Sequence, residues 1–533
     1  MLKKLKTPHL VLLILLSFFI SVEAQAQFTL SAQLRTRTEV RAGYGNLVPK
    51  GSKAAAFTSQ RTRLSFGYKW DRLTFGVAVQ DVRVWGQDAS SISNADGNRF
   101  MLHEAWADVV LANRADTTIK FKLFDLMSLK IGRQELMYDD VRLIGNLDWL
   151  QQARRHDMAL LKTVHKGWQV DIGYAFNQNS DAFGITSTSY VPANLPSYIK
   201  NSYGILVPTP VGILPLAGAG NAGNSSSKIG TPVWSNPPNT NGGTQDYKSF
   251  TSVYISKKFG QTKFSGLFFN DHFGKYKLDS VGNSSEGYVY GRRFVSAGAT
   301  DPFDYAGTNS RFTYGLMINH TIGNASGFGK IAIQAAYYAQ SGKNRDGIKM
   351  KDAYHYTIAA TYQKGKFSVT PGYDVLSGND AGTPEDEKFD PLYGTPHKHW
   401  GFMDYFYVGT GSPAGGLNNP YLKLKYTGNT LALGVDLHSF SLNKTMKKAN
   451  GTEVEKQLGT EVDFVLNYNM NKFTNIELGY SHMIATASMP FAKGQAVTDV
   501  AAEAFRKSGS WFYAMLRIAP DFFYAKPVAL KQP

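Results

Sequence analysis

The chain has 533 residues, no cysteine and a formal net charge of +16, with 51 glycines, 29 tyrosines and 33 phenylalanines. The absence of cysteine excludes disulfide scaffolds and thiolate metal sites, and the slightly negative mean hydropathy is unlike that of a bundle of transmembrane helices. The positive charge favours an anionic partner but does not choose among nucleic acid, lipid headgroups and acidic sugars.

Residues 1–26 have the pattern of a cleaved secretory signal peptide. MLKKLK is basic, VLLILLSFFISV is apolar, and Ala24 and Ala26 fit the small-x-small cleavage pattern, which predicts a mature chain starting at Gln27. An uncleaved anchor is the alternative, but the apolar run is shorter than the roughly 20 residues that a bilayer-spanning helix needs. We therefore expect an exported protein.

The first mature segment, LSAQLRTRTEVR at 30–41, alternates between polar and mostly apolar residues. Period two is the side-chain period of a strand, so one face carries a row of charge and the other is smooth. Residues 58–70 repeat this pattern. The charged positions of the two segments are Arg35, Arg37, Glu39, Arg41, Arg61, Arg63 and Lys69.

Similar alternation recurs along the whole chain and predicts an all-β fold. The predicted strands are 28–41, 58–70, 72–84, 100–111, 121–133, 156–164, 168–177, 248–258, 262–271, 311–321, 328–340, 353–363, 367–376, 399–426 (broken), 431–441, 459–469, 473–483 and 510–520.

The connections between these segments alternate between long and mostly short ones, such as Trp70-Asp71-Arg72. Long loops on one side and tight turns on the other are typical of an outer-membrane β-barrel, with the turns in the periplasm. We predict that residues 27–533 form a single antiparallel barrel of about eighteen strands, too wide for side chains alone to fill. The alternative, an array of soluble β-sandwiches, does not require aromatic residues at the strand ends.

The arginine row carries the first functional hypothesis. An arginine facing lipid at mid-depth costs about 2–4 kcal/mol, so the arginines of the first two strands must face the lumen. There they would form an electropositive stripe that can pair with carboxylates. The alternative is internal scaffolding by ion pairs. The candidate counter-charges are Glu39, Glu104, Asp108, Glu135 and Asp157.

Residues 129–157 are dense in charge and form the second candidate. Lys130 and Arg133 cannot both follow one strict alternation, which a bend at Gly132 would explain. A connection that leaves the strand after Arg133 and re-enters at Asp157 is predicted to fold into the barrel as a constriction.

This segment also carries a family resemblance. Ile131-Gly132-Arg133-Gln134-Glu135-Leu136, then Tyr138-Asp139-Asp140-x-Arg142-Leu143-Ile144-Gly145, Trp149 and Arg155-x-Asp157, is similar to the signature of the alginate-export family of outer-membrane barrels. The run from Phe389 to His399, continuing from Gly401 to Tyr407, resembles members from Bacteroidetes-type bacteria.

The resemblance implies an eighteen-stranded barrel of a Gram-negative outer membrane, whose arginine-lined constriction conducts an acidic polysaccharide. The implied pore-wall residues are Arg35, Arg37, Arg61, Arg63, Arg133, Arg142 and Arg155; alternation adds Arg41 and, in the last strand, Arg517. The chain ends YAKPVALKQP rather than on a strand-terminal aromatic residue, and one architecture can pass different solutes.

Three further segments allow more than one interpretation. The connection 178–247, with its apolar stretch YGILVPTPVGILPLAG, either folds over or into the pore mouth or packs against other loops. The acidic loop 378–390 lacks the spacing of a calcium loop, so a solvated extracellular loop is favoured over a Ca²⁺ site. The pair His397 and His399 has no identifiable third metal ligand.

We therefore expect a passive channel for acidic poly- or oligosaccharides, surrounded by outer-membrane lipid, with no cofactor, no metal, no nucleic-acid partner and no enzymatic activity. No nucleophile-elbow motif, zinc signature or phosphate loop stands out. The alternatives are a general or small-anion porin and, from another class, a surface adhesin or binding barrel with a plugged lumen. Periplasmic export or uptake partners and the direction of transport are left open.

Overall fold

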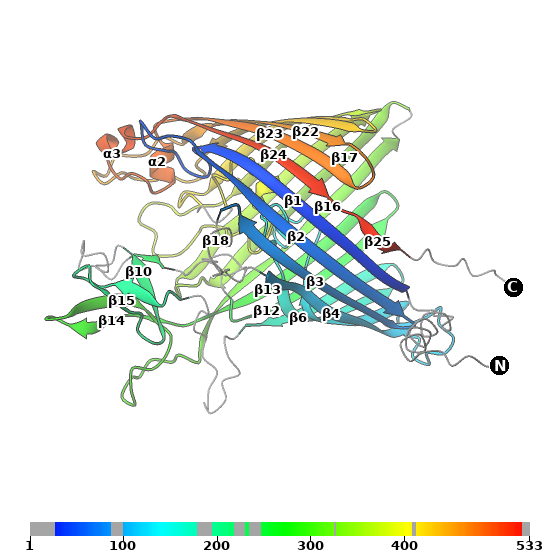
Figure 1. The fold of residues 1–533 in the computed structure, drawn as a ribbon, viewed down its shortest axis with the longest axis horizontal. Coiled ribbons are helices and arrows are strands. Elements are labelled where there is room, and N and C mark those ends of the chain that lie inside the picture. Colours follow the sequence, from blue (N-terminus) through cyan, green and yellow to red (C-terminus); the bar gives the residue numbers. More distant parts are fainter. Residues whose placement is uncertain are drawn as a thin grey trace, which may run out of the picture.

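Eighteen antiparallel strands close a barrel in the computed structural model, which describes residues 27–86, 100–177, 195–217, 230–233, 247–324, 327–407 and 412–524. The barrel closes where β1 pairs with β24, and β25 continues β24 beyond Pro520 and also pairs with β1. Figure 1 shows the tilted strands wrapped into a barrel.

The strands of the barrel are β1 (Gln27–Ala42), β2 (Ala55–Trp70), β3 (Leu73–Val84), β4 (Phe100–Asn113), β5 (Leu126–Gln134), β6 (His156–His165), β7 (Trp168–Phe176), β12 (Ser249–Phe259), β13 (Thr262–Gly274), β16 (Thr308–Asn324), β17 (Gly329–Lys343), β18 (Lys349–Lys364), β19 (Phe367–Leu376), β20 (Leu417–Thr427), β21 (Leu431–Ser441), β22 (Gln457–Asn469), β23 (Thr474–Ala485) and β24 (Ser508–Ile518), followed by β25 (Asp521–Tyr524).

Each of the eighteen predicted strands corresponds to one of these strands, so the fold prediction is confirmed. Two predicted segments were too long. Residues 121–125 precede β5, and in 399–426 only the part from Leu417 onward is a strand. The residues of 399–407 are rich in aromatic side chains, but Trp400, Tyr405 and Phe406 are buried in the core inside the barrel, where Phe406 packs against Phe440 of β21, rather than against lipid.

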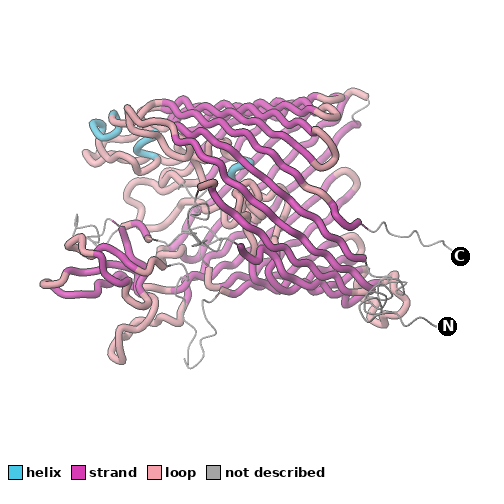
Figure 2. The backbone as a smooth tube through the Cα atoms, viewed as in Figure 1, coloured by secondary structure: helices cyan, strands magenta, loops and turns pink. Residues whose placement is uncertain are grey.

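The outer face of the barrel is apolar, as the alternation predicts. On β2, Leu64, Phe66, Tyr68 and Trp70 are exposed side chains in the absence of lipid. The tight turns lie at one end of the barrel and the long connections at the other, as Figure 2 shows. By the rule for outer-membrane barrels, the tight turns face the periplasm and the long connections face outward. No helix among the described residues is long and apolar enough to cross a membrane.

Two long connections pack against each other beyond the barrel. β10 (Ile213–Ala217) pairs with β15 (Gly287–Arg293), which pairs with β14 (Lys277–Asn283), and β11 (Thr231–Pro232) completes this small sheet. β8 (Tyr198–Lys200) and β9 (Leu206–Pro208) form a separate hairpin. Figure 1 shows the sheet projecting away from the barrel. The described part of 178–247 thus packs against another loop; the rest, like the predicted signal peptide, lies outside the described residues.

A core built from loop residues and inward-facing strand residues fills part of the lumen. Ile144 bridges Tyr393 in parallel, so the connections 135–155 and 377–416 run side by side. Gly394 permits this approach, because a Cβ there would lie 1.9 Å from the carbonyl oxygen of Arg142. The short helix η1 (Pro396–Lys398) belongs to the second of these connections, whereas α2 (Met489–Ala492) and α3 (Asp499–Glu503) belong to the connection between β23 and β24.

Candidate functional site: an arginine cluster in the lumen

Three arginines lie in one row across the barrel wall. Arg35 on β1 stands opposite Arg61 on β2 and, on its other side, opposite Arg517 on β24. Their alternating neighbours Leu34, Thr62 and Leu516 face outward, which puts the three guanidinium groups on the lumen side. Arg63 follows two residues after Arg61 on the same face.

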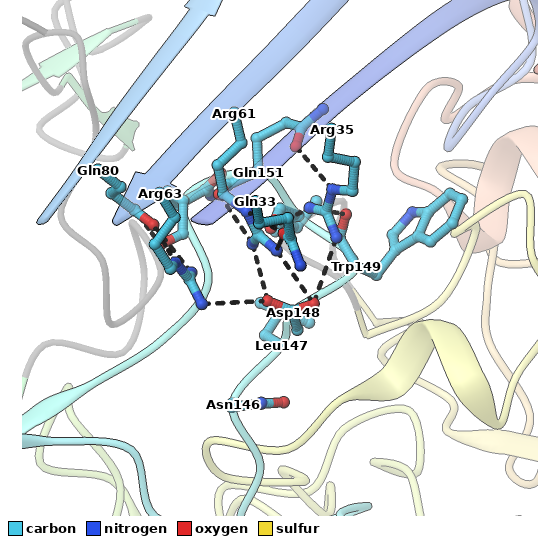
Figure 3. Close-up of polar contacts among 12 residues, drawn as sticks. Gln33, Arg35, Arg61, Arg63, Gln80, Asn146, Leu147, Asp148, Trp149 and Gln151 are labelled. Carbon is cyan, nitrogen blue, oxygen red and sulfur yellow. Dashed lines mark hydrogen bonds and ion pairs between the residues drawn. The ribbon is translucent and has the colours of Figure 1, made fainter. Parts of the chain in front are cut away.

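The carboxylate of Asp148, at the tip of the connection 135–155, meets this row (Figure 3). Its oxygens lie 2.7 Å from Nη1 of Arg61, 3.3 Å from Nη1 of Arg35 and 3.8 Å from Nη1 of Arg63. Arg35 is the ninth of the sixteen residues of β1, so the connection reaches about half-way down the wall. The predicted inward fold of this segment is therefore seen in the structure.

Glutamine side chains hold the arginines in place. Gln33 accepts a hydrogen bond from Nε of Arg61 at 3.1 Å, Gln80 accepts two from Arg63, and Gln151 accepts one from Nε of Arg35 at 2.9 Å. Gln33 and Gln80 come from the neighbouring strands, as Figure 3 shows. Because the arginines lie on paired strands, the barrel wall fixes the positions of their guanidinium groups.

The cluster of Arg35, Arg61, Arg63 and Asp148 has a surplus of positive charge. Burial alone would raise the pKa of Asp148, but the hydrogen bond from Arg61 and the charges of the three arginines hold it below its usual value. Asp148 is therefore ionised at neutral pH, and three cations face one anion. Arg61 is fully buried, whereas 42% of the Asp148 side chain is exposed to the lumen.

Arg37 and Arg41 share one counter-charge nearby. Both pair with Glu39, at 2.9 and 2.7 Å, and Nε1 of Trp511 donates to the same carboxylate. Arg37 also lies over the ring of Trp149 at 4.2 Å. These two arginines therefore fix the loop and its aromatic residue to the wall, in agreement with the scaffolding alternative.

A polar cavity of about 430 Å³ adjoins the cluster on the side of the tight turns. Arg63, Lys472 and Arg517 supply positive charge and Asp521 one negative charge, and Gln33 and Ser65 are also in its lining. Arg517 is exposed. The cavity therefore extends the positive surplus of the cluster toward the periplasmic mouth.

Arg133 and Asp157 differ from their predicted place on the pore wall. Pairing continues through Gly132 on both sides, so the expected bend does not change the alternation. Arg133 lies opposite Ala105 and Asp157, on the face of the outward Ile131, and pairs with Asp157 at 2.7 Å. Since strict alternation persists, Lys130 faces the lumen and this ion pair faces outward.

Arg142 and Arg155 have different environments. Arg142 is buried between Asp140 and Asp374, at 2.7 Å from each, and acts as an anchor for the connection rather than as an open pore residue. Nη2 of Arg155 lies 3.6 Å from the sulfur of Met101. Burial, followed by repulsion from Arg133 and Arg63, lowers the pKa of Arg155 to about 10.

Three of the predicted counter-charges do not pair with the arginine row. Asp108 pairs with Lys162, Glu135 contacts His103 at 3.1 Å, and Glu104 accepts the backbone N–H of Glu135. The potential ligand atoms of His103, Glu104 and Glu135 lie within 4.8 Å of one another. Asn146 already donates to Glu135, at 2.8 Å.

The other considered metal positions are not brought together. His397 contacts Asp404 at 2.7 Å and His399 contacts the carbonyl oxygen of Asp140. In the acidic loop, Asp380 pairs with Lys444 and Asp390 with Arg311. These carboxylates have separate basic partners.

Sequence reasoning missed Asp148 and the three glutamines. Asp148 lies in NLDWLQQ, which has no strand alternation to assign it a face. One signal could have identified Asp148: it is a single carboxylate beside Trp149, on a connection expected to enter a lumen rich in arginine.

Lys493 should make the stability of the folded protein depend on pH. It follows α2 and donates to the carbonyl oxygen of Tyr405, and burial lowers the pKa of Lys493 to about 7, an effect that Asp404 opposes. Because this value lies below that of a free lysine, the folded protein binds fewer protons than the unfolded chain between pH 7 and 10. Stability should therefore rise with pH through this window.

We expect the free energy of unfolding in urea, followed by tryptophan fluorescence in detergent, to increase by about 1–2 kcal/mol from pH 7 to pH 9. Lys493→Met removes the titrating group and should flatten this difference. An equal pH dependence in the variant would show that Lys493 does not titrate there.

The strand count, the closed antiparallel barrel, the outward apolar face and the sorted connections define a porin-like outer-membrane β-barrel. This is the fold class of outer-membrane channels, not that of an enzyme. Residues 24–175 match the model of the family described as alginate export. The resemblance noted from the arginine motifs is thus confirmed over this part of the chain. No curated protein matches.

Solved structures share the fold over nearly the whole chain. Acinetobacter baumannii OccAB1 is 11% identical with a TM-score of 0.51, covering 94% of this chain and 99% of that chain. Pseudomonas aeruginosa OccK9 (OpdG) is 10% identical with a TM-score of 0.51, covering 93% and 98%. Pseudomonas aeruginosa OpdK, solved with vanillate, is 10% identical with a TM-score of 0.50, covering 93% and 99%. At such identities the similarity shows the fold alone.

Proposed function

We propose that the protein is a passive outer-membrane channel that conducts acidic poly- or oligosaccharides along an arginine-lined path. The observation that carries the proposal is the surplus of guanidinium groups around Asp148 and in the adjoining cavity. Guanidinium binds carboxylate bidentately and stays charged at any physiological pH. The family match over residues 24–175 supports the substrate class.

Planar-bilayer recording of the purified protein tests this proposal. In a salt gradient the reversal potential should show a preference for anions, and an oligouronate tetramer should block the current at concentrations at which a neutral tetramer of glucose does not. A cation-selective channel, or equal block by both tetramers, would contradict the proposal.

Two other functions have an observation of their own. A small-anion porin is supported by the shared fold with OpdK, whose structure contains vanillate, a carboxylate; such a channel would be anion-selective but indifferent to the oligouronate. A binding barrel with a filled lumen is supported by the loop core around Tyr393, Trp400 and Phe406. That protein would bind the oligouronate without passing current.

A further inference from the structure

The three arginines and the carboxylate that they bind differ in how they are held. Arg35, Arg61 and Arg63 stand on paired strands of the barrel wall, whereas Asp148 belongs to a connection of about twenty residues. The binding geometry therefore belongs to the wall, and the bound group is delivered by a loop. The arrangement is that of a preformed carboxylate site with an occupant from the same chain.

Other polar contacts also hold the tip to the wall, and several of them come from the arginines of the site itself. Nη2 of Arg35 donates to the carbonyl oxygens of Trp149 and Leu150, each at 3.3 Å, and Nη1 of Arg61 donates to that of Gln151 at 3.3 Å. Nε2 of Gln80 donates to the carbonyl oxygen of Gln152 at 2.9 Å. Nε2 of Gln151 donates to Ser59 at 3.0 Å, and Nη1 of Arg37 donates to the carbonyl oxygen of Trp149 at 2.9 Å. The base of the connection is fixed separately, because Arg142 is buried between Asp140 and Asp374. A carboxylate that binds Arg35 and Arg61 therefore competes for contacts that hold the tip, whereas the anchor at the base uses other residues.

Exchange of one carboxylate for another keeps the charge count of the site unchanged. When Asp148 leaves the three guanidinium groups and a uronate carboxylate takes its place, three cations again face one anion, so the exchange adds no uncompensated buried charge. The incoming carboxylate can reach the cluster from the cavity on the periplasmic side. Arg63, a member of the cluster, lines this cavity, and so does Gln33, which accepts a hydrogen bond from Arg61.

We propose that Arg35, Arg61 and Arg63 form a carboxylate-binding site, that Asp148 occupies it as an internal competitor, and that a carboxylate of the passing saccharide displaces Asp148 and releases the tip of the connection 135–155. This inference rests on the proposed function. By this inference Asp148 weakens the binding of the solute, although it also holds the connection 135–155 against the barrel wall.

Asp148→Asn is the first test, because it removes the competing charge and keeps the size of the side chain. The oligouronate tetramer should block the variant at a concentration at least tenfold lower than it blocks the wild type, and the anion preference should increase. The matched control is Asp157→Asn, on the outer face at the end of the same connection, which should change neither quantity. Unchanged or weaker block in Asp148→Asn would overturn the proposal.

The second test does not depend on a charge change. The chain has no cysteine, so Ser59→Cys introduces a single thiol under Gln151, at a buried position of the wall. A charged thiol reagent should modify it several-fold faster with the oligouronate present than with the neutral tetramer. Ser65→Cys, in the open cavity, should react at one rate under both conditions. Equal rates at Ser59→Cys would show that the tip stays in place.

The outcomes separate this inference from the proposed function. A wild-type channel without anion preference or oligouronate block contradicts the proposed function. A wild type that shows both, together with no gain in Asp148→Asn and no change at Ser59→Cys, contradicts only the role of Asp148.

Discussion

Charge reversal of Arg517 should lower the anion-to-cation permeability ratio on the order of tenfold, since the change removes one positive charge from the lumen and adds one negative charge within a few ångströms of the conducting path. Arg517 is exposed and stands in the row of Arg35 and Arg61. The folded barrel should tolerate Arg517→Glu, because the position is hydrated. Reversal potentials in planar bilayers measure the ratio.

Arg133→Glu is the matched control. It makes the same charge change on the outer face, where Arg133 pairs with Asp157, and should leave the permeability ratio unchanged in the protein that folds. If both variants shifted the ratio equally, the assignment of these two arginines to opposite faces would be wrong. High salt should reduce the effect of Arg517→Glu, because the group is hydrated and screened.

Arg142→Ala should lower the free energy of unfolding by about 3–5 kcal/mol, because it leaves Asp140 and Asp374 buried without their shared cation. The guanidinium also approaches Nε2 of His355 at 3.2 Å. Loss of this anchor frees the base of the connection 135–155, so the open-channel current of the variant should become noisier. Urea unfolding in detergent gives the free energy, and bilayer recording gives the noise.

A double variant and a surface variant control this experiment. Adding Asp374→Asn to Arg142→Ala should recover part of the lost stability, since one uncompensated charge disappears. Arg133→Ala breaks an exposed ion pair and should cost at most about 1 kcal/mol. A loss in Arg142→Ala no larger than in Arg133→Ala would mean that Arg142 is not a buried anchor.

Strand alternation agrees with the face on which the structure places the arginines of β1, β2 and β24, whereas the motif-based placement of Arg133 differs from the structure. Arg35, Arg61 and Arg517 face the lumen with the parity that their strands predict. Arg133 was assigned to the pore from the motif and an expected bend at Gly132, but the hydrogen-bonded register runs through that glycine without a shift. Lys130 and Arg133 therefore stay on opposite faces.

The loops are the other part of the chain in which the prediction and the structure differ. Residues 399–407 resemble a strand in their pattern, yet Trp400 and Tyr405 pack into the lumen core with Ile144 and Tyr393. An apolar side chain is buried equally well against lipid or against another loop, so hydropathy cannot tell the two apart. The close approach at Gly394 is a long-range contact that no local pattern announces.

The sequence by itself determined the strands, their two faces and the sorting of long and short connections, because the side-chain period of a strand and the cost of charge in lipid act residue by residue. Only the tertiary structure decided which charges meet. Arg61 and Asp148 are 87 residues apart, and Arg142 and Asp374 are 232 apart. Such pairs depend on where the connections fold inside the closed barrel, which is set by the packing of the whole chain.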